Sequence, residues 1–563
     1  MSQPTLSNQL ETALQHETTG QLAVAGSTLS VGSVHGALLN DRADSRSVIE
    51  LRQTPILQIP RAFAGLVGRQ AEIESAIAAL QAKQTVEIYG QAGMGKSVLL
   101  RYLAHSPQIT TSHPDGIVDL GAVGSAIDRL QTLFDTFYLS RPEVKMSDRD
   151  LRQAFRERQA LILLDDDVLT ATDLQQLIAA LPNSTFLIAS RDRRFWGDGR
   201  SIRLEGLSLP DSVTLIEQEL GRFASPSTEA SLTSPPKKTI ASLWKLLQGN
   251  PQRLLQVAAL AREDKLPLEM VLSQVQPDEL EQSLTRLILA SLPKPQRWIM
   301  AVLVAMGGTG LLPEQIAVIT GPPNPLPSLQ ALVQRHLLQI QGTHYRLASS
   351  LVEILQKGSN STPWMEKVLA YLLPWAEIHP RSPNTLLAEK ALMLHTLEWA
   401  VSQEHWAETL RLVRSLEGAL ALSKQWETWR RVLNWGLQAA WALEDSTSEA
   451  WGLHQLGTLA ACQEEVTTAY DALTEAISLR SLLDDPVGER LSRHNLEHLR
   501  KITLPTSEGQ RSQLVANPLA VYLTLGLIGF LVFLISGLVG LAVVYRFGQP
   551  VPTAKPVVAP TRK

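Results

Sequence analysis

The sequence predicts an α/β domain with a parallel sheet, followed by helical domains, a helical repeat array and one transmembrane helix. Three observations support this fold class. Short apolar strands alternate with helical segments between Leu66 and Leu209. Residues 364–502 carry apolar positions at 3.6-residue periodicity. Residues 519–545 are uncharged and mostly apolar.

Composition excludes several classes of protein. The chain has 563 residues, of which 44% are hydrophobic and 19% charged, so it is long enough for several domains and is not disordered throughout. A net charge of −4 argues against nonspecific nucleic-acid binding, and we expect no nucleic-acid partner. A single cysteine, Cys462, excludes an internal disulfide and any Cys₂ or Cys₄ metal site. The polar residues at the start of the chain show no secretory signal.

The N-terminal segment is rich in Gly, Ser and Val. Loose alternation of apolar residues between Leu22 and Val34 predicts short strands followed by a linker, and the linker interpretation is favoured. Segments of this kind can also pair with themselves as edge strands. From about Leu66 onward, five apolar runs predict the strands of the parallel sheet: 86–89, 117–120, 161–164, 186–190 and 202–204.

A glycine-rich loop follows the first of these strands. Its residues fit the pattern GxxxxGK[ST] and open an apolar helix at Val98. In such a loop the main-chain N–H groups surround phosphate oxygens, the lysine meets the β- and γ-phosphates, and the hydroxyl can ligate Mg²⁺. The predicted nucleotide-binding residues are Gly90, Gln91, Ala92, Gly93, Met94, Gly95, Lys96, Ser97 and Val98.

Three consecutive acids end the apolar strand 161–164. Asp165 is the predicted Mg²⁺-side carboxylate, Asp166 is predicted to polarise the attacking water, and Asp167 is expected to begin the loop. A solvated acidic turn is the alternative. Strand 186–190 is followed by Arg191, where a γ-phosphate sensor would lie in such a sheet, although a surface charge fits the pattern equally well.

Within the helical array a repeat of 40 residues is visible. Residues 433–456 align with 473–496, matching Asp445 with Asp485 and His454 with His494. This period predicts stacked helical hairpins, and two unrelated amphipathic helix pairs are the alternative.

Residues 519–545 would span about 40 Å as a helix, against a hydrocarbon core of about 30 Å, so they predict a transmembrane helix. A buried core helix is the alternative.

Several of these motifs, in this order, resemble the NB-ARC and related STAND-class signalling ATPases. The run 66–72 resembles the hhGRxxE signature, 161–166 resembles the Walker B motif, 189–191 resembles the Thr-Thr-Arg sensor, and 249–254 resembles the GxP motif. The resemblance implies that Arg69 and Pro251 line the adenine side and that Arg191 senses the γ-phosphate. It also implies a winged-helix domain and repeats of the tetratricopeptide type.

Two departures from the family are visible. Ala348 and Ser349 stand where many relatives have a His-Asp pair that holds ADP. No known effector domain is recognisable at either end. The expected units are 1–63 (N-terminal segment and linker), 64–222 (P-loop domain), 239–277 (helical domain), 278–356 (winged-helix-like domain), 364–502 (repeats), 519–545 (transmembrane helix) and 546–563 (tail).

These features predict an ATP/ADP- and Mg²⁺-dependent signalling switch with slow ATP hydrolysis, in which Asp166, Lys96 and Arg191 act in catalysis. The repeats would bind a ligand or protein partner, activation would assemble homo-oligomers, and residues 519–545 would anchor the chain as a single-pass membrane protein. ATP use and the reduced cysteine place the ATPase and repeats in the cytoplasm. The alternative is a membrane-tethered repeat scaffold whose nucleotide is structural and is not turned over, and a transcriptional regulator of the same class is disfavoured by the near-neutral charge.

Overall fold

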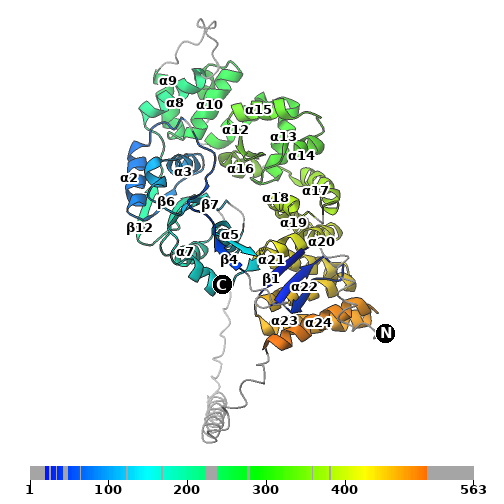
Figure 1. Cartoon of the computed structure of the whole chain (residues 1–563). Coiled ribbons are helices and arrows are strands. Elements are labelled where there is room, and N and C mark those ends of the chain that lie inside the picture. Colours follow the sequence, from blue (N-terminus) through cyan, green and yellow to red (C-terminus); the bar gives the residue numbers. More distant parts are fainter. Residues whose placement is uncertain are drawn as a thin grey trace, which may run out of the picture. The chain divides into compact units, whose positions relative to one another are not determined.

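The computed structural model describes residues 20–24, 27–32, 34–41, 48–63, 65–121, 124–141, 143–165, 169–221, 237–275, 279–357, 359–379 and 382–503. Residues 1–499 form one compact unit (Figure 1). All structural statements below concern the described residues.

A six-stranded parallel sheet forms the α/β domain. Its strand order is β12-β6-β11-β10-β7-β5, so β11 lies between the strand that precedes the glycine-rich loop and the strand that ends in acids. The predicted parallel sheet is confirmed. The strands are β5 (Ile56–Gln58), β6 (Thr85–Tyr89), β7 (Gly116–Asp119), β10 (Ala160–Asp165), β11 (Thr185–Ser190) and β12 (Gly199–Arg203).

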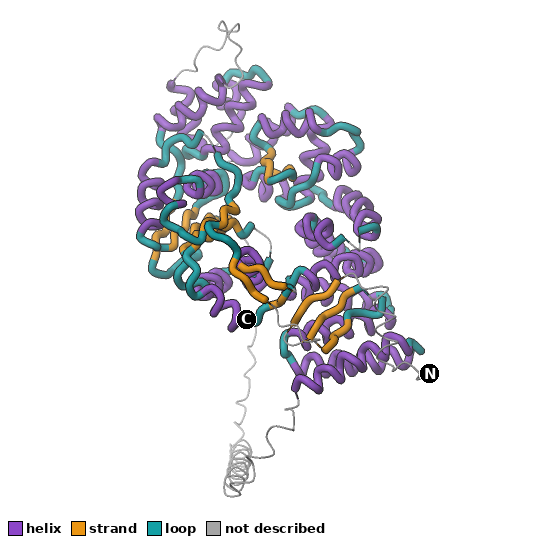
Figure 2. Tube along the Cα trace, viewed as in Figure 1, coloured by secondary structure: helices purple, strands orange, loops and turns teal. Residues whose placement is uncertain are grey.

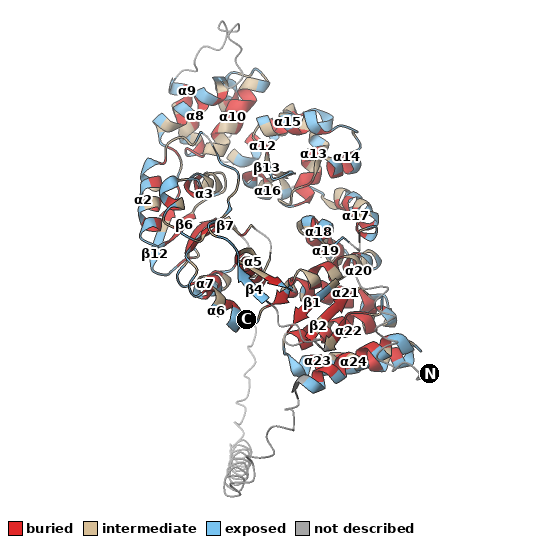
Figure 3. Cartoon of the chain, in the orientation of Figure 1, coloured by how far each residue is buried: buried red, intermediate tan, exposed pale blue. Residues whose placement is uncertain are grey.

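Helices cover both faces of this sheet. Along β10, Leu161 and Leu163 pack into one apolar core, whereas Ile162 and Leu164 pack into another on the opposite face. Because side chains alternate between faces, a strand covered on both sides is apolar throughout, which is why these runs are recognisable in the sequence (Figure 3). The helices of the domain are α2 (Gln70–Gln81), α3 (Lys96–Ala104), α4 (Pro107–Thr110), α5 (Ala126–Phe137), α6 (Asp148–Phe155) and α7 (Ala171–Ala180).

Two smaller sheets accompany the domain. The N-terminal segment folds into β1 (Gly20–Val24), β2 (Ser27–Val31) and β3 (Leu38–Asp41), and β1 pairs in parallel with β9 (Val144–Lys145) of the α/β domain. Strands β4 (Val48–Leu51) and β8 (Tyr138–Arg141) form an antiparallel pair. The segment interpreted from the sequence as a linker therefore contributes β5 to the main sheet and three strands to a second one (Figure 2).

The chain continues into two groups of helices. The first group consists of α8 (Leu209–Gly221), α9 (Lys237–Leu247), α10 (Pro251–Glu263) and α11 (Leu268–Gln274). The second combines helices with a two-stranded antiparallel sheet: α12 (Leu280–Ser291), α13 (Lys294–Ala305), α14 (Pro313–Thr320), α15 (Leu326–Gln334), β13 (Leu338–Gln341), β14 (His344–Leu347) and α16 (Ser349–Gln356). Assignment of this second group as a winged-helix domain stays a prediction.

The C-terminal region is helical, and its last five helices have 17 or 18 residues each. Helices α20 to α24 begin at residues 406, 426, 446, 466 and 486, each 20 residues after the last, so two helices account for the 40-residue period in the sequence. A residue with positive φ lies in each turn that precedes them: Glu404, Lys424, Glu444, Glu464 and Asp484. The helices are α17 (Thr362–Glu377), α18 (Pro383–Ala388), α19 (Lys390–Ser402), α20 (Trp406–Leu422), α21 (Trp426–Ala442), α22 (Ser446–Cys462), α23 (Val466–Leu482) and α24 (Pro486–Thr503).

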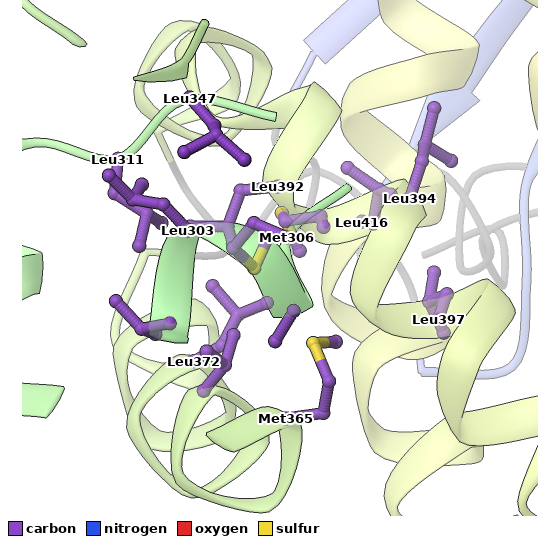
Figure 4. Close-up of a cluster of buried hydrophobic side chains, with 14 of the residues drawn as sticks. Leu303, Met306, Leu311, Leu347, Met365, Leu372, Leu392, Leu394, Leu397 and Leu416 are labelled. Carbon is purple, nitrogen blue, oxygen red and sulfur yellow. The ribbon is translucent and has the colours of Figure 1, made fainter. Parts of the chain in front are cut away.

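One apolar core runs from the second group of helices into the repeats. Leu303 of α13, Leu347 of β14, Leu372 of α17 and Leu416 of α20 belong to the same buried cluster (Figure 4). Because protein interiors are packed densely, these elements cannot separate at this point without exposing the cluster to water. The helical group and the start of the repeats therefore share one buried core.

The predicted transmembrane helix requires a correction. Among the described residues no helix is both long and apolar enough to cross a bilayer. The longest, α24, has 18 residues, and charged side chains such as Glu489 and Arg493 lie along it. On this finding the transmembrane part of the fold class and the single-pass membrane localisation are wrong. Residues 519–545, to which the span was assigned, lie outside the described residues, as do the tail 546–563 and the acids Asp166 and Asp167.

Candidate functional site: a glycine-rich loop faced by two helices

The glycine-rich loop joins β6 to α3. Gly90, Gly93 and Gly95 all have positive φ, a conformation that residues with a Cβ rarely adopt. At Gly90 a Cβ would also lie 2.6 Å from the carbonyl oxygen of Leu204. The N-cap residue of α3 is Gly95, which has no side chain to bond the first N–H groups of the helix, and in a loop of this type such groups bind phosphate oxygens.

Lys96 and Ser97 lie at the start of α3 as the sequence predicts for a phosphate site. The Lys96 ammonium donates to the carbonyl oxygens of Gly90 at 2.6 Å and Gln91 at 3.0 Å. The Ser97 hydroxyl donates to Asp165 Oδ1 at 2.8 Å, which brings the loop and the acidic strand end together. A hydroxyl and a carboxylate oxygen at this distance fit Mg²⁺, which prefers oxygen ligands.

A second carboxylate, Asp119, lies near Asp165 at the end of the neighbouring strand β7. Burial raises the pKa of Asp119, the backbone N–H of Gly121 lowers it, and the charge of Asp165 raises it further. Asp119 is not among the residues predicted from the sequence. Its position after an apolar strand in a parallel sheet is the available signal, because the carboxyl ends of parallel strands lie at one edge.

Arg69 lies beneath the loop. It is 8% exposed, adopts a left-handed backbone conformation with φ 71°, and donates from Nη2 to the carbonyl oxygens of Met94 at 3.2 Å and Glu205 at 2.5 Å. Its guanidinium therefore connects the glycine-rich loop to the chain after β12. The adenine-side role implied by the family resemblance stays a prediction.

Helix α10 closes directly over the loop. Asn250, which precedes Pro251 at the first position of the helix, donates from Nδ2 to the Ala92 carbonyl at 3.0 Å, and the Gln252 N–H donates to the Gly93 carbonyl at 3.3 Å. Asn250 is 1% exposed, and its Oδ1 also caps α10. The sequence motif singled out Pro251, but the side chain of this motif that hydrogen-bonds the loop is that of Asn250.

Arg191 follows β11 and reaches across to α16. Its Nη1 lies 3.1 Å from Glu353 Oε2, and both side chains are about half exposed. The sequence predicts Arg191 at this strand end but indicates no partner for it. A carboxylate on a helix more than a hundred residues later has no signal in the sequence.

Glu87, buried in β6, positions the segment that contains Arg191. Its carboxylate accepts from the Ser190 hydroxyl at 3.0 Å, the Arg194 N–H at 2.8 Å and the Phe195 N–H at 3.2 Å. These bonds fix the turn after β11 relative to the strand that carries the loop. Glu87 is not among the predicted site residues, although a lone glutamate inside an apolar strand is a signal for such a role.

A cavity of about 630 Å³ lies in front of the loop. It is bounded by Gln91 and Ala92 of the loop, Arg191, Arg253 of α10, and residues of α12 and α16 that include Ser349 and Ser350. Of the two positions where many relatives have a His-Asp pair, Ser349 lines this cavity, whereas Ala348 is buried and does not.

Arg346 of β14 is a further basic group close to the acidic strand end. Burial lowers the pKa of Arg346, whereas the charge of Asp165 raises it and that of Arg101 lowers it. Nothing in the sequence pattern distinguishes Arg346 from other arginines on short strands.

Comparison with known proteins supports this interpretation of the α/β domain. Residues 69–219 match the model of the NB-ARC domain family. No match is found among curated proteins. Among solved structures, the chain is similar to a STAND protein with a tetratricopeptide repeat sensor from Pyrococcus horikoshii, with 15% identity over 80% of this chain and 70% of that chain and a TM-score of 0.45.

A second solved structure, a Walker-type ATPase of Pyrococcus abyssi, shares 15% identity over 52% of this chain and 96% of that chain, with a TM-score of 0.28. Both TM-scores are low.

Proposed function

We propose that the chain is a nucleotide-dependent signalling switch: ADP or ATP with Mg²⁺ binds at the loop Gly90–Ser97, and the helical repeats sense a partner. The observation that carries the proposal is the contact of Ser97 with Asp165 at the start of α3, next to a loop that α10 contacts and a cavity that α16 also lines. Slow hydrolysis would reset the switch, and activation would assemble several copies.

The proposed roles follow from the positions of the side chains. Lys96 would exchange the carbonyls of Gly90 and Gln91 for phosphate oxygens, because an ammonium prefers the stronger negative charge. Ser97 and Asp165 would hold Mg²⁺, which neutralises phosphate charge. Asp166 stays the proposed group that orients water.

The ion pair between Arg191 and Glu353 supplies a mechanism for switching. If Arg191 senses the γ-phosphate, ATP competes with Glu353 for its guanidinium, whereas ADP leaves the pair intact. ATP would then favour release of α16 from the α/β domain. Coupling of this kind is typically worth about 1–3 kcal/mol, the difference between the affinities of the two states for the nucleotide.

Isothermal calorimetry with ADP and with ATP, both with Mg²⁺, tests the nucleotide site. We expect Lys96→Ala to abolish measurable binding, and Lys245→Ala, an exposed lysine on α9, to leave it unchanged. Normal ATP affinity in Lys96→Ala contradicts the site.

The scaffold alternative differs only in turnover. Steady-state phosphate release from the wild type, compared with Asp166→Asn, separates the two: equal rates at background level favour a structural nucleotide.

A further inference from the structure

β3 is the edge strand of the N-terminal sheet, and this sheet lies beside the helices of the repeats (Figure 2). Side chains of the repeats bind the outer main-chain groups of β3 and of Ala37, which precedes it. The Ala37 N–H donates to Gln455 Oε1 at 2.7 Å, and the Leu39 N–H donates to Asn495 Oδ1 at 2.9 Å. Asn495 Nδ2 returns a bond to the Ala37 carbonyl at 2.9 Å. Ala37 and Leu39 are thus bound along the edge of β3 that does not pair with β2.

Histidines and an arginine complete this set of contacts. The carbonyl of Ala37 lies 2.7 Å from His454 Nε2, and that of Leu39 lies 2.6 Å from His494 Nε2. Arg480 donates to the carbonyl of His35. We call the five residues of α22, α23 and α24 that make these contacts the strand-binding face: His454, Gln455, Arg480, His494 and Asn495.

The strand-binding face is prepared for its occupant by bonds within the repeats. Gln455 Nε2 donates to Glu417 at 2.9 Å, which aims its Oε1 at the strand, and Asn495 also donates to the Thr458 hydroxyl at 2.8 Å. His454 Nδ1 lies 3.0 Å from the Ser492 hydroxyl. Burial and the charge of Arg480 lower the pKa of His454 to about 3, so the ring is neutral.

Buried polar side chains cost free energy unless they are hydrogen-bonded. His454, Gln455 and Asn495 are at most 1% exposed, and each has a main-chain group of the strand as a partner. An extended chain in this position is therefore required to satisfy the face. Because the contacts are made to main-chain atoms, they select an extended conformation and not a particular sequence.

One position does select a residue type. Gly36 has φ +122°, and a Cβ there would lie 2.2 Å from Cδ2 of His454. Any other residue would collide with the ring, so the face accepts a strand only if glycine stands at this position.

We propose that residues 34–41 are an intramolecular occupant of a peptide-binding site on the repeats, and that this site takes an extended, glycine-containing segment of a partner protein in their place. The proposal deepens the sensor role in the proposed function and rests on it. In the sheet that holds β3, β1 pairs with β9 of the α/β domain, so replacing β3 would act on the sheet that lies between the repeats and that domain.

The test uses a fluorescein-labelled, acetylated peptide of residues 34–41 and the full chain. Gly36→Val in the chain should eject the occupant and leave the strand-binding face intact. A tethered occupant competes at an effective concentration in the mM range. Fluorescence anisotropy should therefore show the peptide binding Gly36→Val at least tenfold more tightly than the wild type.

Three controls make the result specific. Gly342→Ala, another glycine with positive φ but with no atom within 4 Å of its Cβ, should behave as the wild type. Gly36→Val combined with Asn495→Ala should lose the gain, and a peptide with valine at position 36 should not bind. If Gly36→Val does not fold by circular dichroism, Ala37→Pro, which removes the N–H given to Gln455, takes its place.

Tight binding to the released variant that depends on Asn495 supports the proposal. Equal binding to the wild type and the released variant, or to neither, overturns it. Calorimetry of ATP and ADP binding on the same samples distinguishes the two proposals, because peptide binding is measured independently of nucleotide affinity.

Discussion

Asp128 of α5 connects the α/β domain to the repeats, and replacing it by alanine tests how strongly the two are coupled. The carboxylate accepts from the Thr428 hydroxyl at 2.8 Å, the Thr428 N–H at 3.2 Å and the Glu427 N–H at 3.4 Å, so it caps α21 from another domain. Asp128 is 3% exposed. Water therefore cannot replace these bonds while this interface stays closed.

The size of the effect follows from the hydrogen bonds that the Asp128 carboxylate accepts. Removing a helix cap costs about 1 kcal/mol. Leaving the buried Thr428 hydroxyl and N–H groups without a partner costs a further 1–3 kcal/mol or so. We therefore expect Asp128→Ala to destabilise the closed interface by about 2–4 kcal/mol, which shifts its equilibrium by about 30- to 700-fold.

Hydrogen exchange followed by mass spectrometry measures this shift directly. Peptides that cover the first turn of α21, including Thr428, should exchange faster in Asp128→Ala by about the same factor. Asp173→Ala is the matched control, because Asp173 belongs to the capping box of α7 and its bonds in that box stay within the nucleotide domain. Unchanged exchange at α21 in Asp128→Ala would refute the reasoning.

Three further predictions test the chemistry of single groups. Burial raises the pKa of Glu417 to about 7, so the folded chain keeps a proton that the unfolded chain releases between about pH 4.5 and 7, and stability falls as pH rises through that window. Glu417→Gln removes this loss, and its Tm advantage over wild type should be larger at pH 8 than at pH 5; an equal difference at both counts against it. Glu353→Ala removes the ion-pair partner of Arg191 and should raise ATP affinity relative to ADP in calorimetry, whereas an unchanged ratio argues against competition for Arg191. Ser97→Ala removes the hydroxyl that donates to Asp165 and should weaken the Mg²⁺ dependence of nucleotide binding, with ADP binding without Mg²⁺ as the control.

Features that depend on residues close together in the sequence, such as buried strands, the glycine-rich loop and the helical repeat, could be predicted from it. The central strands β10 and β11 are recognisable because burial on both faces makes them almost wholly apolar, whereas the edge strand β5 lies in the segment interpreted as a linker. The loop 90–97 is recognisable because its backbone demands glycine at fixed positions. The 40-residue period is visible because each pair of helices repeats the same packing. In each case the residues that determine the structure are neighbours in the sequence, so their pattern is visible there.

Contacts between distant segments are not predictable in this way. Asn250 binds the glycine-rich loop and Glu353 binds Arg191, and each is a single polar residue whose partner lies far away in the sequence. The position of β3 on the repeats is still harder to predict, because the contacts are made to main-chain atoms, which are the same in every residue. The transmembrane prediction relied on the length of the apolar run 519–545, which lies outside the described residues, and no described helix could cross a bilayer.

The interactions that hold the chain closed differ in kind, and this difference suggests an order of opening. Arg191 and Glu353 form a half-exposed ion pair, and such pairs contribute little to stability. The bonds of Asp128 and those of Asn495 are buried, so they are costly to break unless another partner takes their place. In the proposed switch a nucleotide would therefore break this ion pair by itself, but it would leave the buried bonds of Asp128 and Asn495 in place. Release of the repeats requires a ligand that satisfies the strand-binding face, and a switch built in this way responds fully only when nucleotide and partner are both present.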